Sequence, residues 1–489
     1  MTGRLWQAMH DSLRQHHDRP AVGSAGAQVS YAELDEQSAA LQRRIATHTA
    51  GLRPRPRIAL FAGNGIGYVT AFLAILRDGG VPLLFDPGWG AVELNAAIRS
   101  CGVDLVLHDR ALTGVPSRVL AETADAMTVS EPLERVEGPE MAPDTEVCRY
   151  TSGTTGFANC IEFAGSAVLG AAAGWREGTG LSSEDRILCF AGLSNGLAFN
   201  TSLNPGLLAG SLLVLPAGLP TSGQVARFLT ECEPSLLTGF PALYSSLLRR
   251  TGELPGLSRL RVALSSGAPL PAADAVELRE RHGLAIANYY GVAEVGPLTF
   301  DPEPAPERGL GSPLPGVVFD LGDAADDEQP RPIAVRSQSM GTRYLNAPGV
   351  FEAKLDAAGF YRTGDEGFLR EGRLHLAGRS GKAVNVGGRK IDPREVEAVL
   401  TGVPGVTAAA VVAVTKRNGD AALGAVVAAS DAVSADALRA HCRSVLADYK
   451  VPERLVVVEA LPLTAIGKPR LTAVRELLGD TVLPTASAS

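Results

Sequence analysis

Hydroxyl side chains and glycines gather in one short segment of the sequence, Tyr150-Thr151-Ser152-Gly153-Thr154-Thr155-Gly156. Five of its seven residues carry a hydroxyl group, and its two glycines leave backbone N–H groups open to a ligand. Because such donors can surround an anion, the segment predicts a phosphate-binding loop, with an ordinary surface loop as the alternative. The Gly-Lys-Ser/Thr ending of the Walker A loop is missing, so that class of nucleotide site is excluded.

Three other short motifs carry side chains that suit nucleotide chemistry. Tyr290 precedes Glu294 by four residues, and an aromatic ring can stack on a base while a carboxylate can hold Mg²⁺ near phosphates. In the segment 361–365, which we predict to be a turn, Asp365 could accept two hydrogen bonds from ribose hydroxyls. Lys468 stands on a glycine-containing loop. Each motif also has a structural interpretation: a strand end, an Asx turn and a solvated lysine, respectively.

The distribution of lysine limits where an amine could act. All six lysines lie at or after Lys354, and the residues before it use arginine alone. Chemistry that needs a lysine amine must therefore come from the last third of the chain.

Composition excludes several classes of protein. The 489 residues correspond to about three structural units of ~150 residues each. The net charge of −8 argues against a general nucleic-acid binder, and the 45% hydrophobic content argues against a disordered chain. No apolar run approaches the ~18–20 residues of a membrane span, and the N-terminus has no apolar signal region. The six cysteines show no zinc-site spacing, so we expect reduced thiols in a cytoplasmic protein.

Strand and helix patterns alternate along most of the chain. Apolar runs at 57–61 and 81–85 predict strands with a helix over 68–77 between them, and the alternation returns later in the sequence. A boundary near 378–381 separates a smaller region with its own βαβ character, which includes a strand at 454–458. The sequence therefore predicts an α/β fold with a largely parallel sheet.

Together, and in this order, the motifs resemble those of the ANL superfamily of adenylate-forming enzymes: acyl- and aryl-CoA synthetases, peptide-synthetase adenylation domains and luciferases. The resemblance covers nearly the whole chain, from the helix predicted at 31–47 to Lys468. Its motifs are YTSGTTG (150–156), SSGAPL (265–270), YYGVAE (289–294), YRTGD (361–365), GRSGKAVNVGGRKIDPREVE (378–397), YKVP (449–452) and PLTAIGK (462–468).

The resemblance implies a particular α/β architecture. Residues 1–379 would form a large N-terminal adenylation core, made of two α/β subdomains and a distorted β-barrel. Residues 380–489 would form a small, mobile α+β lid domain, and the hinge would lie near Gly381. A glycine there suits a hinge because it allows large backbone rotations.

The resemblance also implies roles for single residues. Thr151, Ser152, Gly153, Thr154, Thr155 and Gly156 would hold the β- and γ-phosphates of ATP. Gly267, Ala268 and Pro269 would line the adenine, on which Tyr290 would stack. Asp365 and Arg379 would hold the ribose, Glu294 would bind Mg²⁺, and Lys468 would reach between the substrate carboxylate and the α-phosphate. The substrate pocket would be lined by Asn195, Gly196, Asn200, Gly291 and Val295.

The implied reaction is an ATP-dependent acid–thiol ligation. A small carboxylic acid would be activated as an acyl-adenylate with release of pyrophosphate, and the acyl group would then pass to CoA or to the phosphopantetheine of a carrier protein acting in trans. The first step brings two anions together, and Lys468 and Mg²⁺ are suited to cancel that repulsion.

Four departures from the family pattern leave alternatives open. Asn159 stands where the phosphate loop usually has lysine, and Ala293 stands where threonine is usual. The segment 192–197 lacks the usual His or aromatic gate, and Asn200 replaces the aspartate of amino-acid-activating members. One alternative is an adenylating enzyme with an unusual oxyanion or acceptor, such as nitrite activation for N–N bond formation, or amide formation. Another is a degenerate nucleotide-binding protein.

Overall fold

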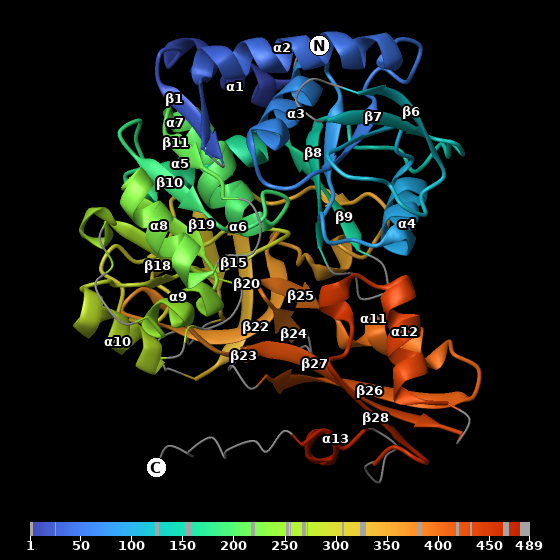
Figure 1. Ribbon diagram of the computed structural model, residues 1–489. Helices are drawn as coiled ribbons and strands as arrows, with labels where there is room; N and C mark the ends of the chain where they lie inside the picture. The colour runs from blue at the N-terminus through green and yellow to red at the C-terminus, as the bar shows by residue number, and fades with distance from the viewer. Residues whose placement is uncertain are drawn as a thin grey trace. The chain divides into compact units, whose positions relative to one another are not determined.

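The computed structural model describes all residues except 1–2, 25, 123–126, 152–157, 217–220, 251–253, 255, 267–269, 271, 306–307, 323–328, 380–383, 417–419, 431–432, 463–468 and 480–489 (Figure 1). The chain divides into two compact units. Unit 1 comprises Met1–Pro87, Ile98–Tyr150 and Asn159–Gly381, and unit 2 comprises Gly88–Ala97, Thr151–Ala158 and Lys382–Ser489. The predicted α/β class, with a large and a small part, is confirmed. The predicted lid boundary and hinge stay a prediction, because residues 380–383 lie outside the description.

The first large sheet of unit 1 has the strand order β21-β9-β8-β4-β3-β5-β7-β6, with a parallel centre. Strands β3 and β4 are buried throughout, because a parallel sheet with both faces covered has apolar strands. The strands are β3 (Arg57–Phe61), β4 (Val81–Leu84), β5 (Leu105–His108), β6 (Ser117–Glu122), β7 (Thr128–Pro132), β8 (Thr145–Thr151), β9 (Asn159–Ala164) and β21 (Arg343–Tyr344).

The second large sheet of unit 1 has the order β14-β13-β12-β10-β11-β1-β2, and only β2 runs antiparallel to its neighbour. Its strands are β1 (Pro20–Ser24), β2 (Ala27–Ser30), β10 (Arg186–Cys189), β11 (Leu212–Val214), β12 (Leu236–Gly239), β13 (Val262–Ser265) and β14 (Ala287–Asn288). The carboxyl ends of β13 and β14 lie side by side, since Ser265 is in register with Asn288.

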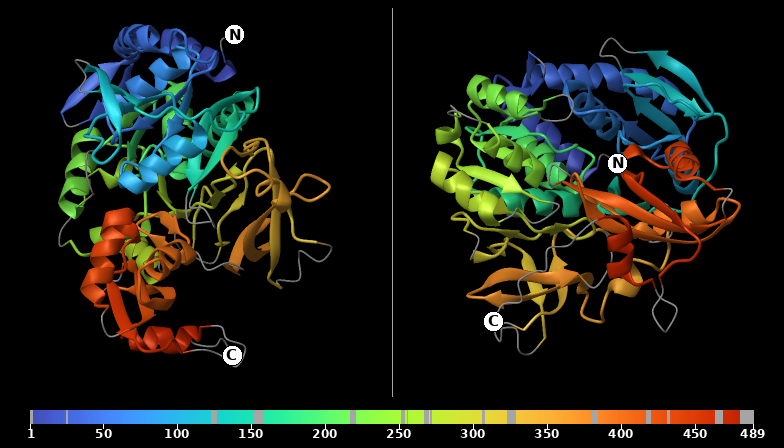
Figure 2. Two further views of the ribbon diagram at one scale, coloured as in Figure 1. Left: turned by 90° about the vertical axis from the view of Figure 1, so that its right-hand side faces the viewer. Right: turned by 60° about the horizontal axis from the view of Figure 1, so that its bottom comes forward.

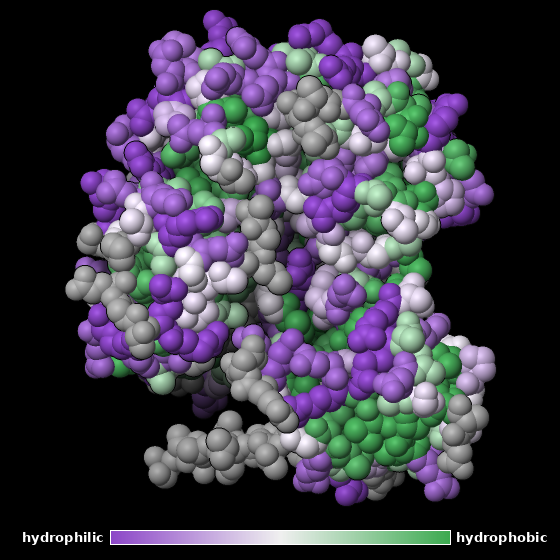
Figure 3. Space-filling view, viewed as in Figure 1, coloured by the Kyte–Doolittle hydropathy of each residue, from purple (hydrophilic) through white to green (hydrophobic). Residues whose placement is uncertain are grey.

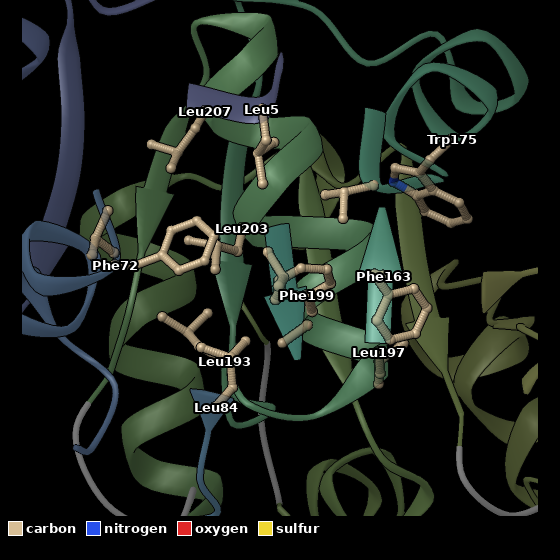
Figure 4. Close-up of a cluster of buried hydrophobic side chains, with 14 of the residues drawn as sticks. Leu5, Phe72, Leu84, Phe163, Trp175, Leu193, Leu197, Phe199, Leu203 and Leu207 are labelled. Atoms are coloured by element: carbon tan, nitrogen blue, oxygen red, sulfur yellow. The ribbon is translucent and has the colours of Figure 1, made fainter. Parts of the chain in front are cut away.

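Helices join the two sheets through one apolar core. Helix α1 contacts α2, α3, α5 and α7, and their buried side chains form one cluster with strands of both sheets (Figure 4). A second cluster lies under α8, α9 and α10. The helices are α1 (Arg4–Gln15), α2 (Tyr31–Thr49), α3 (Ile66–Arg77), α4 (Ala91–Cys101), α5 (Gly165–Thr179), α6 (Gly196–Ala198), the π-helix η1 (Phe199–Leu203), α7 (Asn204–Ala209), α8 (Ser222–Cys232), α9 (Pro241–Leu248) and α10 (Ala272–His282).

The rest of unit 1 is antiparallel. A four-stranded sheet has the order β19-β20-β22-β23, formed by β19 (Val317–Asp320), β20 (Arg331–Ser337), β22 (Tyr361–Arg370) and β23 (Arg373–Arg379). Figure 2 shows these strands, yellow to light orange, as a layer beside the green α/β part. Two short ladders pair β15 (Gly291–Val292) with β16 (Gly296–Pro297) and β17 (Thr299–Phe300) with β18 (Ser312–Pro313).

Unit 2 is built on a three-stranded sheet of β26 (Val406–Thr415), β27 (Ala421–Ala429) and β28 (Arg454–Val458). Helices α11 (Pro393–Thr401) and α12 (Ala435–Val445) share a core with one face, and α13 (Leu471–Leu477) packs on the other. Strands β24 (Val384–Val386) and β25 (Arg389–Ile391) form a hairpin. Figure 3 shows apolar residues at the surface of this sheet region.

A buried lysine holds two carboxylates together inside unit 2. The Nζ of Lys450 donates to Oε1 of Glu93 and to Oε1 of Glu395, both at 2.6 Å, and all three side chains are buried. Burial alone would lower the pKa of Lys450, but the two carboxylates outweigh that effect and raise it. Burial raises the pKa of Glu395, although Lys450 opposes the rise. The ammonium therefore compensates two buried acids at once.

Replacing Lys450 with methionine leaves Glu93 and Glu395 buried without a cation. We expect Lys450→Met to lose about 3–5 kcal/mol of unfolding free energy at pH 7 relative to wild type. Burial already raises the pKa of Glu395, and losing the lysine removes the charge that opposes this rise, so protonation of Glu395 favours the folded state. The loss is therefore largest at neutral pH and shrinks toward pH 5, which urea unfolding at both pH values would measure.

The matched control is Lys416→Met, since the Lys416–Glu453 pair at 2.7 Å is half-exposed. Such a pair contributes about 0–1 kcal/mol, so the control should change little at either pH. An equal loss for Lys450→Met at pH 5 and pH 7 would contradict the interpretation.

Candidate active site in unit 1

The structure brings the predicted adenine residue Tyr290 and the predicted ribose residue Asp365 into direct contact. The Tyr290 hydroxyl donates to Oδ2 of Asp365 at 2.8 Å, and each residue is only 6% exposed. A hydrogen bond from a neutral donor to a buried carboxylate fixes the orientation of the acid and offsets part of its desolvation. Two residues expected to meet the same nucleoside therefore lie at one place, although 75 positions separate them.

Asp365 lies on a strand rather than in the predicted turn. Residues 361–365 open β22, and Tyr361, Thr363 and Asp365 alternate toward the buried side. The Oγ1 of Thr363 donates to the carbonyl of Ile333 and accepts the backbone N–H of Asp365. The Asx-turn interpretation was therefore wrong, because pairing with β20 and β23 supplies the partners that a turn would have provided. The composition of the segment resembles that of a turn because it includes a glycine, Gly364, which has φ +77° in the structure.

The segment that contains Tyr290 follows the carboxyl end of a parallel strand. Strand β14 ends at Asn288, next to the end of β13 at Ser265, and the backbone N–H of Tyr289 donates to the Ser265 carbonyl at 2.9 Å. Ligands of open α/β sheets bind at such carboxyl ends. The segment 267–269 follows β13 directly, but Gly267, Ala268 and Pro269 lie outside the described residues.

Glu294 ends a chain of hydrogen bonds that begins at a lysine. The Tyr344 hydroxyl donates to Oε1 of Glu294 at 2.5 Å, the hydroxyls of Tyr344 and Tyr361 are 3.4 Å apart, and Lys354 Nζ donates to the Tyr361 hydroxyl at 3.0 Å. The Tyr344 hydroxyl uses its one hydrogen to donate to Glu294. In the hydrogen bond between the two tyrosines, Tyr361 is therefore the donor. Burial, and then the charge of Glu294, raise the pKa of Tyr344, which therefore remains a donor. Sequence reasoning missed this chain.

The environment of Glu294 fits a magnesium ion bound together with phosphates. Glu294 is 8% exposed, and the described residues give its second oxygen, Oε2, no hydrogen-bond partner. Mg²⁺ is usually held by one or two carboxylates and by substrate phosphates rather than by an all-protein cage. The described part of the chain contains no group of three His, Cys, Asp or Glu side chains that could hold a metal ion.

The residues predicted to line the substrate pocket come from two neighbouring segments. Asn195 caps α6, accepting the N–H of Leu197 at 2.9 Å, and Gly196 begins that helix. Asn200 is buried on η1. Helix α6 contacts β15, which holds Gly291, and η1 contacts β16, next to the buried Val295. The structure therefore gathers these five residues in one region, and their role in lining a substrate pocket stays a prediction.

Asn64, which sequence reasoning missed, fixes the segment that leads into this region. Its Nδ2 donates to the Ala191 carbonyl at 2.8 Å, and its Oδ1 accepts the backbone N–H of Leu193 at 2.9 Å. Both polar atoms of the Asn64 amide thus hold the chain just before Asn195.

Arg149 is a second residue that sequence reasoning missed. It is 2% exposed on β8, its NH2 donates to the Ala293 carbonyl at 3.0 Å, and its guanidinium carbon lies 4.6 Å from the Phe163 ring centroid and 4.8 Å from that of Phe199. The signal was available: a charged residue interrupts a strand directly before the hydroxyl-rich loop.

Several predicted site residues cannot be placed. Ser152, Gly153, Thr154, Thr155, Gly156, Gly381 and Lys468 lie outside the described residues. Thr151 is the last residue of β8, and the buried Asn159 begins β9, so the strands on both sides of the predicted phosphate loop are described. Arg379 ends β23 in register with Asp365, which brings its backbone beside the predicted ribose residue; its side chain is not among those described.

Comparison with known proteins assigns both parts of the chain. A family model described as AMP-binding enzyme matches residues 9–350, and a model described as AMP-binding enzyme C-terminal domain matches residues 395–468. The chain is 29% identical over 483 residues to a feruloyl-CoA synthase of Amycolatopsis, covering 94% of this chain and 96% of that protein. It is 28% identical over 494 residues to a 4-chlorobenzoate–CoA ligase of Arthrobacter, covering 93% and 91%.

A solved structure supports the fold. A double mutant of the o-succinylbenzoate-CoA synthetase of Bacillus subtilis is 23% identical and matches with a TM-score of 0.83, covering 96% of this chain and 98% of that one. The resemblance to adenylate-forming enzymes is confirmed by these matches. Since the first family model spans well over half of the sequence, this chain belongs to the family of AMP-binding enzymes.

Proposed function

We propose that this AMP-binding enzyme activates a carboxylic acid with ATP as an acyl-adenylate, releases pyrophosphate and passes the acyl group to the thiol of CoA. The observation that carries the proposal is the buried arrangement of Tyr290, Asp365 and Glu294 in unit 1. It offers an aromatic ring and a carboxylate for a nucleoside, and a further carboxylate for the phosphate end. Family membership supports the same reaction class.

The charges needed for the first step are divided among several residues. The substrate carboxylate must approach the α-phosphate, so two anions meet, and negative charge develops on the pyrophosphate that leaves. Mg²⁺ held by Glu294 and the phosphates would neutralise part of that charge. Lys468 would stand between the carboxylate and the α-phosphate. Asp365 and Arg379 would hold the ribose, so that the α-phosphate is presented in a fixed position.

CoA is the acceptor that we favour. The CoA ligases named above match this chain over more than 90% of both lengths, so the likeness extends over nearly the full length of those relatives. A carrier protein acting in trans presents the same phosphopantetheine thiol, and it would enter by the same route. No described helix is long and apolar enough to cross a bilayer. A cytoplasmic location, where CoA and ATP are available, is part of the proposal.

Pyrophosphate release tests the function directly. We expect the wild-type protein with ATP, Mg²⁺ and a panel of acids to release pyrophosphate with one acid class, and mass spectrometry to detect the matching adenylate. The panel contains aryl, short-chain, long-chain, dicarboxylic and amino acids together with nitrite. Addition of CoA should convert the adenylate into a thioester. ATP binding without turnover for any member would overturn the proposal in favour of a nucleotide-binding protein.

Lys468→Ala should lower the rate of adenylate formation by about 10²–10³, because the variant loses a charge placed against the reacting anions. The measurement is single-turnover adenylate formation followed by mass spectrometry. Lys416→Ala serves as the control, since Lys416 forms a half-exposed pair with Glu453 and should leave the rate unchanged. A normal rate for Lys468→Ala would show that the lysine does not act in this step.

Tyr290→Phe keeps the aromatic ring but removes the hydrogen bond to Asp365. Hydrogen bonds to charged groups contribute about 1.5–3 kcal/mol, so we expect the KM for ATP to rise about 10-fold or more while the KM for the acid stays the same. Tyr244→Phe is the matched control. Tyr244 is also fully buried, but its hydroxyl donates to the Leu264 carbonyl at 2.7 Å, so it should lower stability alone. An unchanged KM for ATP in Tyr290→Phe would contradict the role.

A further inference from the structure

Arg149 carries a buried positive charge that the described protein does not neutralise. Its guanidinium has five N–H donors, and the described residues accept from one of them, through the Ala293 carbonyl. The Nε has no hydrogen-bond partner, and no described carboxylate lies within ion-pair distance of the group. Burial lowers the pKa of Arg149 to about 10, while Tyr289 and Glu294 oppose the shift, so the group remains charged at neutral pH.

Other buried cations in this chain are handled differently, which makes Arg149 informative. Lys450 holds two carboxylates in unit 2. Arg57, 4% exposed on β3 of the same sheet as Arg149, donates to the carbonyls of Cys101 and Pro139 and lies near Asp104, which raises its pKa against the effect of burial. Since an unpaired buried charge is costly, a cation left in this state calls for an anionic partner beyond the described residues.

The residues packed around Arg149 determine which sides of its guanidinium are covered. The planar group lies against the rings of Phe163 on β9 and Phe199 on η1, which Figure 4 shows in the core beside Leu197. Aromatic faces hold a guanidinium but accept none of its in-plane N–H bonds. One edge faces the Ala293 carbonyl. Another edge packs against Gly196, where a Cβ atom would stand 2.6 Å from NH1, so only a glycine at position 196 leaves room for the guanidinium.

Tyr68 supplies a second donor of the same kind. Its hydroxyl, on α3, is buried and has no hydrogen-bond partner in the described structure, and the residue is 2% exposed. Phe72, four residues after Tyr68 on α3, packs edge-on against the Phe199 ring that also flanks Arg149. Burial raises the pKa of Tyr68, and the positive charge of Arg149 acts against this rise. A neutral hydroxyl donor and a guanidinium with unused donors are the components of an anion site.

We propose that Arg149, with Tyr68, binds a second anionic group of the acid that this enzyme activates, so that its substrate class is a carboxylic acid with two negative charges, such as a dicarboxylate. The inference rests on the proposed function and specifies its substrate. Gly196, which the guanidinium edge meets, is one of the residues assigned to the substrate pocket. The anchored group is the second anion rather than the reacting one, because hydrogen bonds from a buried guanidinium lower the nucleophilicity of the carboxylate oxygens that accept them.

Pairs of acids that differ only in the second charge test the proposal. Malonate, succinate, glutarate and terephthalate are each compared with the corresponding monoamide in the pyrophosphate-release assay. We expect the wild type to favour one dianion over its monoamide by about 30-fold or more in kcat/KM, the range for a buried charge that keeps its partner. Arg149→Met should lose this preference and use the monoamide at least as well as the wild type does.

Stability separates an anchor from a structural residue. Removing an uncompensated buried charge in favour of an apolar chain of similar length should leave the melting temperature of Arg149→Met unchanged or higher. Arg57→Met is the matched control: its partnered guanidinium is lost, so it should melt lower while keeping the wild-type preference between dianion and monoamide. If Arg57→Met does not fold, Arg149→Gln provides the comparison, with the same expected loss of preference.

Three results would overturn the proposal. One is a wild type that does not distinguish dianions from monoamides. Another is an Arg149→Met variant that loses activity equally toward all acids and melts lower, which indicates a structural arginine. The third is a rise in the KM for ATP alone, which indicates a phosphate contact. Failure of the proposed function gives a different signature, namely no adenylate from any acid. In that case a melting shift of the wild type with the dicarboxylates, absent in Arg149→Met, still decides whether the anion site exists.

Discussion

A buried carboxylate must be hydrogen-bonded, and unit 1 is organised by the way this requirement is met for Asp365 and Glu294. The hydroxyl of Tyr290 reaches Asp365 from the end of the second parallel sheet, and Tyr344, on the edge strand of the first sheet, reaches Glu294. The four residues come from three separate segments, since Tyr290 and Glu294 are neighbours in sequence, and the strands that carry Tyr344 and Asp365 belong to different sheets. Placing two acids in the interior therefore fixes how the antiparallel layer meets the α/β layers. Asp365 and Glu294 can therefore bind a ligand only when the strands that carry them and their hydrogen-bond partners are assembled.

The regular elements could be predicted because burial leaves a clear pattern. The apolar run at 57–61 became β3 with the same bounds, and the run at 454–458 became β28. The helix expected over 68–77 begins two residues earlier, at Ile66, directly after its N-cap residue Gly65. Each strand is an apolar run of four residues after an arginine, and local composition is sufficient to identify it, although only β3 is buried throughout. The family motifs added the identity of the site residues.

What could not be predicted depended on partners distant in sequence. Residues 361–365 read as a turn because Gly364 and Asp365 favour turns, yet pairing with two neighbouring strands makes them β22. Helix α1 was not predicted, and its N-terminus is held by Glu146, more than a hundred positions away. Tyr344 and Asn64 looked like ordinary residues until their partners were known. A pattern in a single sequence contains no information on such pairings. The residues that hold the predicted site residues in place therefore could not be predicted.

The departures from the family pattern acquire a physical meaning through charge. The sequence lacks the phosphate-loop lysine at Asn159, and the described part of unit 1 has one lysine, Lys354, which is engaged with Tyr361. Arg149 lies directly before the predicted phosphate loop and keeps its positive charge against the rings of Phe163 and Phe199. A dianionic acid would otherwise bring a second negative charge close to Glu294 and the triphosphate, where low polarity strengthens repulsion. A guanidinium built into β8 before the substrate arrives offsets that charge without a moving side chain, because its two flanking rings already hold it in place. The energy stored in leaving this cation unpaired is recovered when an anion binds, which favours the charged substrate over a neutral analogue of the same shape.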